Sequence, residues 1–279
     1  MGRSGSPRRR TVPRSAGAGA TPTGSLAAAG AGDAAPERPA LIAHRGYDGL
    51  YVENTLGAMR AASRHGADLI EIDVLPCADD VIVVFHDLRL DAKTDEEGFV
   101  PETPCETVLG AEVLGSGQTI PTLTEVLETI PARIGVNVEF KDPGRYGRGA
   151  RPTDADDRWL PFARRVLDIA AGYDNGILVS SFYDDALAAV REVDPSVPIA
   201  SLFADSAERG LLVARQYDCE AIHPWKGITD EDLVMAAHDQ GREVNPYTIT
   251  THAEATHLRD LGVDGVIADS PEVFATAST

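Results

Sequence analysis

The sequence has few cysteines and no long apolar run. No stretch approaches the roughly 18 consecutive apolar residues that a membrane-spanning helix requires, so we predict no transmembrane segment. The three cysteines, Cys77, Cys105 and Cys219, are far apart and form no Cys-x-x-Cys pair. This spacing argues against a zinc site, a redox motif or a disulfide framework.

Positive charge is also scarce. The chain of 279 residues has a formal net charge of -19, and lysine occurs only at positions 93, 141 and 226. Residues 1–38 carry a net charge of +4, which leaves -23 for residues 39–279. A segment as acidic as residues 39–279 should repel nucleic acid and anionic membranes, so we expect no nucleic-acid partner. The acidic excess fits either adaptation to high salt, which screens negative charge, or an ordinary acidic surface.

Residues 1–38 lack aromatic side chains, and their only larger aliphatic residues are Val12 and Leu26. Such a segment cannot bury enough apolar surface to offset the entropy of ordering, so we predict a disordered tail. The Arg8–Arg10 run is compatible with a twin-arginine export signal, but residues 11–32 contain no hydrophobic stretch. We therefore predict a cytoplasmic protein, with export as the alternative.

Residues 39–279 differ from the tail, because short aliphatic runs alternate there with helix-like segments. This pattern is typical of βα units around a parallel sheet, and the length suits one domain with one large core. The candidate strands are Ala40–Ala43, Leu69–Val74, Val81–Phe85, Ile134–Phe140, Ile177–Ser181, Ile199–Phe203, Ala221–His223, Glu243–Ile249 and Gly265–Ala268. They number one more than a regular (β/α)₈ barrel contains.

The extra strand has a local explanation. The connection between Leu69–Val74 and Val81–Phe85 is too short for a crossover helix and suits a hairpin. We therefore predict an irregular (β/α)₈ TIM barrel. Residues 88–119 show weak periodicity, and we interpret them as a small loop insertion after the third strand, with little core of its own.

Polar residues stand at the ends of four predicted strands. They are His44-Arg45-Gly46, Glu71-Ile72-Asp73, His86-Asp87 and Glu139-Phe140-Lys141. In a barrel of parallel strands the active site lies at the C-terminal strand ends. We therefore expect these groups to meet at one mouth.

Three of these residues are carboxylates. The alternation of a strand puts Glu71 and Asp73 on one face, and Glu139 can join them from the neighbouring strand. Three like charges in a partly buried mouth are costly unless a cation neutralises them. Ligation by oxygen alone suits Mg²⁺ or Ca²⁺ better than zinc, so we predict one such divalent cation at this site.

The other polar groups suit hydrolysis of a phosphate ester. Arg45 can hold a phosphate group through two hydrogen bonds, and Lys141 supplies a point charge. His44 and His86 are the natural acid and base, because the unperturbed pKa of imidazole lies nearest neutrality.

Around these residues the sequence resembles the glycerophosphodiester phosphodiesterase family. The motifs are His44-Arg45-Gly46, Glu53-Asn54-Thr55, Glu71-Ile72-Asp73, His86-Asp87, Ile120-Pro121-Thr122-Leu123, Glu139-Phe140-Lys141, Ser180-Ser181-Phe182 and Gly262-Val263-Asp264-Gly265-Val266-Ile267-Ala268-Asp269. The resemblance implies an irregular TIM barrel in which Glu71, Asp73 and Glu139 bind the metal. It also implies acid and base roles for His44 and His86, and phosphate contacts from Arg45 and Lys141.

The resemblance further implies the substrates and the reaction. Substrates would be small diesters such as glycerophosphocholine and glycerophosphoethanolamine. A glycerol hydroxyl attacks phosphorus, the alcohol leaves with a proton from one histidine, and water opens the cyclic phosphate to glycerol 3-phosphate.

The sequence departs from the family pattern at two places. The family usually has proline where this chain has Val52, and often a Trp-Thr-Val-Asn stretch where this chain has residues 247–250. We predict that Glu53 and Tyr247 contribute to substrate binding and that Asn54 caps the following helix. His223 is a further candidate for contact with substrate, and Asp269 is expected to be a structural hydrogen-bond partner.

Two other functions remain open at this point. A lysophospholipase D-like phosphodiesterase would need an apolar entrance to the barrel. A non-catalytic barrel that binds a phosphorylated ligand would not need both histidines and three carboxylates. The sequence does not indicate an oligomeric state.

Overall fold

The computed structural model describes residues 38–143 and 155–274. The predicted disordered tail lies outside these ranges apart from Arg38, whose Nη1 is 2.7 Å from Asp68 Oδ2. Within the described ranges no helix is long and apolar enough to cross a membrane.

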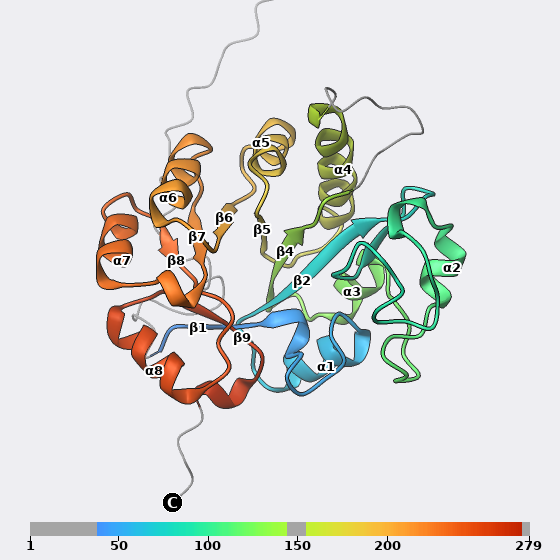
Figure 1. Ribbon diagram of the computed structural model, residues 1–279, viewed down its shortest axis with the longest axis horizontal. Helices are drawn as coiled ribbons and strands as arrows, with labels where there is room; N and C mark the ends of the chain where they lie inside the picture. The colour runs from blue at the N-terminus through green and yellow to red at the C-terminus, as the bar shows by residue number, and fades with distance from the viewer. Residues whose placement is uncertain (1–37, 144–154, 275–279) are drawn as a thin grey trace, which may run out of the picture.

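Eight parallel strands form a barrel (Figure 1). In spatial order they are β8 (Glu243–Val244), β7 (Ala221–Pro224), β6 (Ile199–Phe203), β5 (Ile177–Ser181), β4 (Gly135–Phe140), β2 (Leu69–Pro76), β1 (Ala40–Ala43) and β9 (Gly265–Ala268). The gap between β8 and β9 is bridged by main-chain hydrogen bonds, from Asp264 N to Val244 O at 3.0 Å and from Ile267 N to Pro246 O at 2.9 Å. The predicted barrel is confirmed.

One predicted strand is much shorter than expected. The prediction of Glu243–Ile249 holds only for Glu243–Val244, and the rest of the segment makes isolated bridges at Tyr247 and Ile249. Pro246 explains the interruption, because proline lacks the main-chain N–H that a regular ladder requires.

Helices surround the barrel (Figure 1). They are α1 (Leu56–Arg64), α3 (Leu123–Thr129), α4 (Ala155–Ala170), α5 (Asp184–Val193), α6 (Ala207–Gln216), α7 (Glu231–His238) and α8 (His252–Leu261), with 3-10 turns at His44–Gly46, Val100–Glu102, Lys226–Ile228 and Pro271–Phe274. Thr122 and Thr251 begin α3 and α8 with capping boxes, in which side chain and main chain satisfy each other's donors. Ile70, Ile72 and Val74 of β2 belong to the main core, so the alternate residues of that strand face into the barrel.

The ninth strand, β3 (Ile82–Val84), pairs with β2 in the antiparallel direction, as the hairpin prediction required. The insertion that follows contains the short helix α2 (Cys105–Gly110) and lies beside the outer end of β2 (Figure 1). The prediction that this insertion has little core was wrong. A second buried cluster comprises Leu75, Cys77, Val83, Phe85, Leu90, Val100, Val108, Ala111, Val113 and Ile120. The β2–β3 hairpin supplies part of this cluster, and the insertion residues reach it from turns and from the short helix α2, which are too short to show a regular period.

Arg191 hydrogen-bonds the loops at the N-terminal end of the barrel, which is the end opposite the mouth. Its guanidinium donates to Tyr217 O at 2.9 Å, to Val197 O at 2.8 Å and to Glu220 Oε2 at 2.6 Å. Arg191→Met should lower the free energy of unfolding by about 2–3 kcal/mol, because a charged donor is lost and its acceptors are left unpaired. Urea denaturation measures this loss, and kcat should not change.

The matched control is Arg209→Met. Arg209 is exposed, and its Nη2 lies 3.2 Å from Asp184 Oδ2 at the surface. Exposed ion pairs contribute less than about 1 kcal/mol. An equal loss of stability in the two variants would contradict the special role of Arg191.

Candidate active site

Three buried carboxylates converge in the barrel mouth, as the sequence predicted. Glu71 and Asp73 come from β2 and Glu139 from β4, and Asp73 and Glu139 are direct neighbours in the register of the two strands. One oxygen atom of each residue lies within 4.8 Å of the others. This is a compact set of oxygen ligands of the kind that Mg²⁺ or Ca²⁺ prefers.

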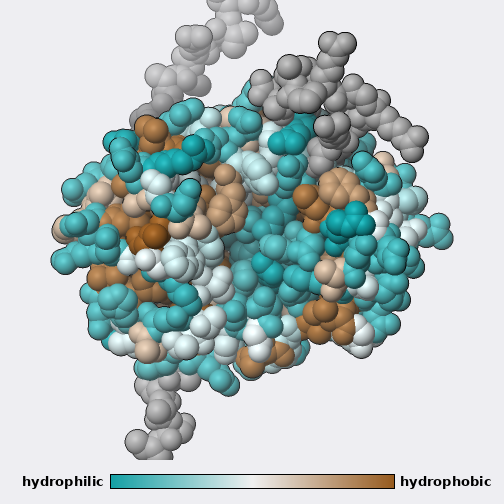
Figure 2. Space-filling view, viewed as in Figure 1, coloured by the Kyte–Doolittle hydropathy of each residue, from teal (hydrophilic) through white to brown (hydrophobic). Residues whose placement is uncertain are grey.

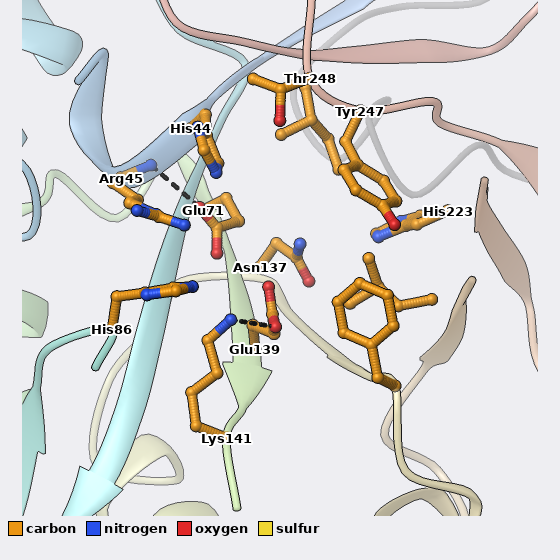
Figure 3. A pocket seen from close by; sticks show the side chains of 13 residues that line it. His44, Arg45, Glu71, His86, Asn137, Glu139, Lys141, His223, Tyr247 and Thr248 are labelled. Atoms are coloured by element: carbon orange, nitrogen blue, oxygen red, sulfur yellow. Dashed lines mark hydrogen bonds and ion pairs between the residues drawn. The ribbon is translucent and has the colours of Figure 1, made fainter. Parts of the chain in front are cut away.

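Arg45 and Lys141 contact these carboxylates, and Figure 3 shows them beside Glu71 and Glu139. Arg45 Nε is 3.1 Å from Asp73 Oδ2, and its main-chain N donates to Glu71 Oε2 at 2.9 Å. Lys141 Nζ is 2.9 Å from Asp73 Oδ1 and also binds Glu139. The two predicted phosphate-binding cations therefore lie next to the predicted metal ligands.

The negative charge of the carboxylates is only partly balanced. Burial and the nearby Asp73 charge raise the pKa of Glu71 to about 8. Burial also raises the pKa of Glu139, against the attraction of Lys141. For Asp73, burial is outweighed by Lys141 and Arg45, which hold the pKa of its carboxyl well below the usual range.

Glu71 offers a ligand atom that the protein itself does not use. Its Oε1 is buried and has no hydrogen-bond partner among the residues described. A buried carboxylate oxygen without a partner is costly unless a cation or a proton satisfies it. The residues present therefore fit a divalent cation.

Asn54 has a different role from the predicted helix cap. Thr55 caps α1, accepting a hydrogen bond from Ala58 N at 3.3 Å. Asn54 instead donates from Nδ2 to Asp73 Oδ2 at 2.8 Å and accepts from Asp73 N at 3.3 Å. Its φ of 57° lies in the left-handed region that asparagine tolerates, and this turns its side chain back toward β2. The cap prediction was wrong by one residue.

His44, which directly follows β1, is held by two carboxylates. Its Nδ1 lies 2.7 Å from Asp269 Oδ1 and 3.7 Å from Asp48 Oδ1. Burial disfavours its charge, but the hydrogen bonds to Asp269 and Asp48 outweigh burial and raise the pKa of His44 to about 10. Asp269 is therefore a hydrogen-bond partner, as expected, and the residue that it contacts is His44, a predicted catalytic residue.

His86 has the opposite electrostatic environment. Its Nδ1 lies 2.5 Å from Asp87 Oδ1, yet burial and the repulsion of Lys141 and Arg45 lower the pKa of His86. At neutral pH His44 is therefore protonated and His86 is neutral. Pairs of titratable groups whose pKa values are driven apart are typical of acid and base pairs.

Glu53 pairs with two basic side chains, those of Arg45 and Lys93. Within the described ranges it is not among the residues that line the cavity. Its Oε1 accepts from Arg45 Nη1 at 3.2 Å and from Lys93 Nζ at 2.7 Å. Lys93 comes from the insertion and also lies 3.7 Å from Asp87 Oδ2. No sequence motif pointed to Lys93, because its position depends on the path of the insertion.

A cavity of about 200 Å³ opens between these groups. Its polar side is formed by His44, Arg45, Glu71, His86, Glu139 and Lys141, and its other side by Phe182, Leu202, Tyr247, Thr248 and Ile267, with Asn137 and His223 also lining it. The ring of Tyr247 meets Phe182 edge-on, with centroids 5.9 Å apart, so Tyr247 forms part of the pocket wall. Figure 2 shows a hydrophilic hollow near the centre of this face, with hydrophobic residues on both sides.

Comparison with known proteins shows the family of this chain. A model of the glycerophosphoryl diester phosphodiesterase family matches residues 44–273. The chain belongs to this family. The predicted resemblance and the predicted enzyme class are therefore confirmed.

Individual relatives cover most of the chain. A glycerophosphodiester phosphodiesterase of Bacillus altitudinis is 29% identical over 245 residues, covering 83% of this chain and 95% of the relative. An Oleispira antarctica phosphodiesterase, solved in complex with the product sn-glycerol-3-phosphate, is 26% identical with a TM-score of 0.74, covering 84% of this chain and 94% of that one. The glycerophosphodiester phosphodiesterase of Thermotoga maritima shares the fold, with a TM-score of 0.69 at 24% identity, covering 86% of this chain and 98% of that one.

Proposed function

We propose that this enzyme hydrolyses small glycerophosphodiesters, such as glycerophosphocholine and glycerophosphoethanolamine, to an alcohol and glycerol 3-phosphate. The observation that carries the proposal is that a cluster of three buried carboxylates, of which Glu71 and Glu139 line the cavity, lies at one cavity with two basic side chains and two histidines of opposite charge preference. The sn-glycerol-3-phosphate in the Oleispira antarctica structure supports this product.

Glu71, Asp73 and Glu139 would hold one Mg²⁺ or Ca²⁺. The unpartnered Oε1 of Glu71 and the raised pKa of that carboxyl support this assignment. When bound, the cation neutralises phosphate charge and makes a nearby hydroxyl more acidic.

Arg45 and Lys141 would bind the non-bridging phosphate oxygens. Both side chains border the cavity, and both are already oriented by Asp73. A guanidinium can contact two phosphate oxygens at once, whereas an ammonium acts as a point charge. Together they fix the phosphorus atom between the two histidines.

The histidines would move the protons. His86 is neutral, and with Nδ1 engaged by Asp87 its Nε2 can accept the proton of the attacking glycerol hydroxyl. His44 is protonated and can give its Nε2 proton to the departing alcohol. The new bond joins the hydroxyl oxygen to phosphorus, the bond from phosphorus to the alcohol oxygen breaks, and water then opens the cyclic phosphate.

Asp269→Asn tests how His44 is kept protonated. The substitution removes a negative charge from Nδ1, so the pKa of His44 should fall by about one to three units. Because a general acid works only below its pKa, the alkaline limb of the kcat profile should move to lower pH. Profiles of kcat against pH measure this shift. Asp260→Asn, an exposed change on α8, is the control, and an unshifted limb in Asp269→Asn would refute the role of Asp269.

One observation favours a second substrate class, the lysophospholipids. Phe182 and Trp225, on the loops after β5 and β7, are 45% and 44% exposed. Exposed aromatic residues beside a cavity can receive an apolar chain. On the insertion side the neighbours of Arg45 are polar, because Glu53 Oε1 accepts from both Arg45 Nη1 and Lys93 Nζ.

Turnover of a substrate panel separates the possibilities. Glycerol 3-phosphate release from glycerophosphocholine and glycerophosphoethanolamine should exceed choline release from 1-acyl-lysophosphatidylcholine at equal concentrations. Preference for the lysolipid would replace the proposed substrate class. Binding of glycerol 3-phosphate without turnover of any diester would instead indicate a ligand-binding barrel.

A further inference from the structure

Two buried polar groups of the cavity have no role in the proposed proton and metal chemistry. Asn137, on β4, and His223, on β7, both line the cavity and are almost completely buried. Figure 3 shows both side chains at this pocket, and β5 and β6 separate the two strands that carry them. Neither residue belongs to the carboxylate cluster.

Each of these side chains has a polar atom with no hydrogen-bond partner in the described part of the chain. Within residues 38–143 and 155–274, Asn137 Oδ1 and His223 Nδ1 are buried and have no hydrogen-bond partner. Native proteins rarely leave buried polar atoms unpaired, and such atoms require an explanation such as a bound ligand or water. Two of them on one cavity indicate a ligand.

The hydrogen-bonding character of the pair is specific. Asn245 Nδ2 lies 3.4 Å from His223 Nε2, and because an amide NH₂ donates, Nε2 is the acceptor. The proton of the neutral imidazole is then on Nδ1, which is a donor. Asn137 Oδ1 is an acceptor, so these two unpartnered atoms present one donor and one acceptor.

A hydroxyl group is the complement of this pair, because it accepts from one partner and donates to another. A phosphodiester group would satisfy only the donor, since its oxygens carry no proton to donate to Asn137 Oδ1. An alkyl chain would leave both polar atoms unpaired.

We infer that Asn137 and His223 bind the terminal hydroxyl of the glycerol moiety, the one that does not attack phosphorus. This inference rests on the proposed function and adds the selection of a substrate class. A diester whose terminal hydroxyl is free satisfies both residues. A diester whose terminal hydroxyl is missing or acylated leaves them unpaired and is rejected.

Two matched diesters test the inference with one leaving group, ethanolamine. The first contains glycerol, and the second contains propane-1,2-diol, which keeps the attacking hydroxyl but lacks the terminal one. Sites built to hydrogen-bond a hydroxyl strongly reject analogues that lack it. We expect kcat/KM for the glycerol diester to be at least about 100-fold higher.

Variants of His223 connect this preference to the residue. His223→Leu removes the donor, and kcat/KM for the glycerol diester should fall about 100-fold while that for the propanediol diester changes less than about threefold. His223→Asn places an amide NH₂ near the position of Nδ1 and should restore most of the preference. Asn137→Leu should act like His223→Leu.

The outcomes separate the inference from the proposed function. Equal turnover of the two diesters by the unaltered enzyme, or equal loss on both diesters in His223→Leu, overturns the inference alone. If neither diester is hydrolysed, the proposed function and the inference fall together. A loss of activity on both substrates by misfolding is recognised by a lowered melting temperature, and in that case Asn137→Leu decides by the same ratio.

Discussion

His44→Gln should lower kcat for glycerophosphoethanolamine by about 100-fold to 10,000-fold, the usual contribution of a general acid or base. The protonated imidazole is held by Asp269 and Asp48 and borders the cavity, so it can give its proton to the alkoxide that leaves. Ethanolamine is a poor leaving group without that proton. Steady-state kinetics of the variant measure the loss.

The leaving group makes this experiment specific. A glycerol diester of p-nitrophenol needs little protonation, so His44→Gln should lose less than about tenfold on it if His44 is the acid. His86→Gln should lose activity on both substrates, because the base acts on the attacking hydroxyl. Equal losses for His44→Gln on the two substrates would contradict the assignment. His257→Gln, at an exposed position on α8, is the control.

Glu71→Gln should lower kcat at least about 1000-fold, because a metal ion contributes several kcal/mol to stabilising the transition state. The same substitution should not lower the stability of the metal-free protein. Burial raises the pKa of Glu71 to about 8, so without metal its carboxyl is mostly protonated at neutral pH, and glutamine replaces it without removing a stabilising charge. In chelator, the melting temperature of the variant should equal or exceed that of the unaltered protein.

Metal-dependent stabilisation completes this test. A ligand that binds only the folded state raises the melting temperature, so Mg²⁺ or Ca²⁺ should stabilise the unaltered protein and not Glu71→Gln. Glu192→Gln, an exposed change on α5, should retain both activity and stabilisation. Equal stabilisation of Glu71→Gln by the metal would place the cation elsewhere.

The sequence predicted the parts of the site that follow from strand periodicity. Glu71, Asp73 and Glu139 were placed together because alternate residues of neighbouring strands face one side, and the register of β2 and β4 agrees. The hairpin between β2 and β3 followed from a connection too short for a helix. These features depend on local chain geometry.

Features that depend on irregular segments could not be predicted in this way. Asn54 reaches Asp73 only because its backbone turns to positive φ, and Lys93 reaches Glu53 only through the path of the insertion. The insertion contributes to its second core from turns and from the six-residue helix α2, which are too short or irregular for a period to be detected. Pairing His44 with Asp269 joins residues 225 positions apart in the sequence, and only barrel closure brings them together.

The central claim is that the carboxylate cluster binds a divalent cation with which the enzyme releases glycerol 3-phosphate. The most direct measurement is ³¹P NMR of glycerophosphoethanolamine with the purified enzyme, first stripped of metal and then supplied with Mg²⁺ or Ca²⁺. We expect no change of the diester signal in chelator and conversion to glycerol 3-phosphate once metal is added. Hydrolysis at full rate in chelator, or an unchanged diester with either metal, would contradict the claim.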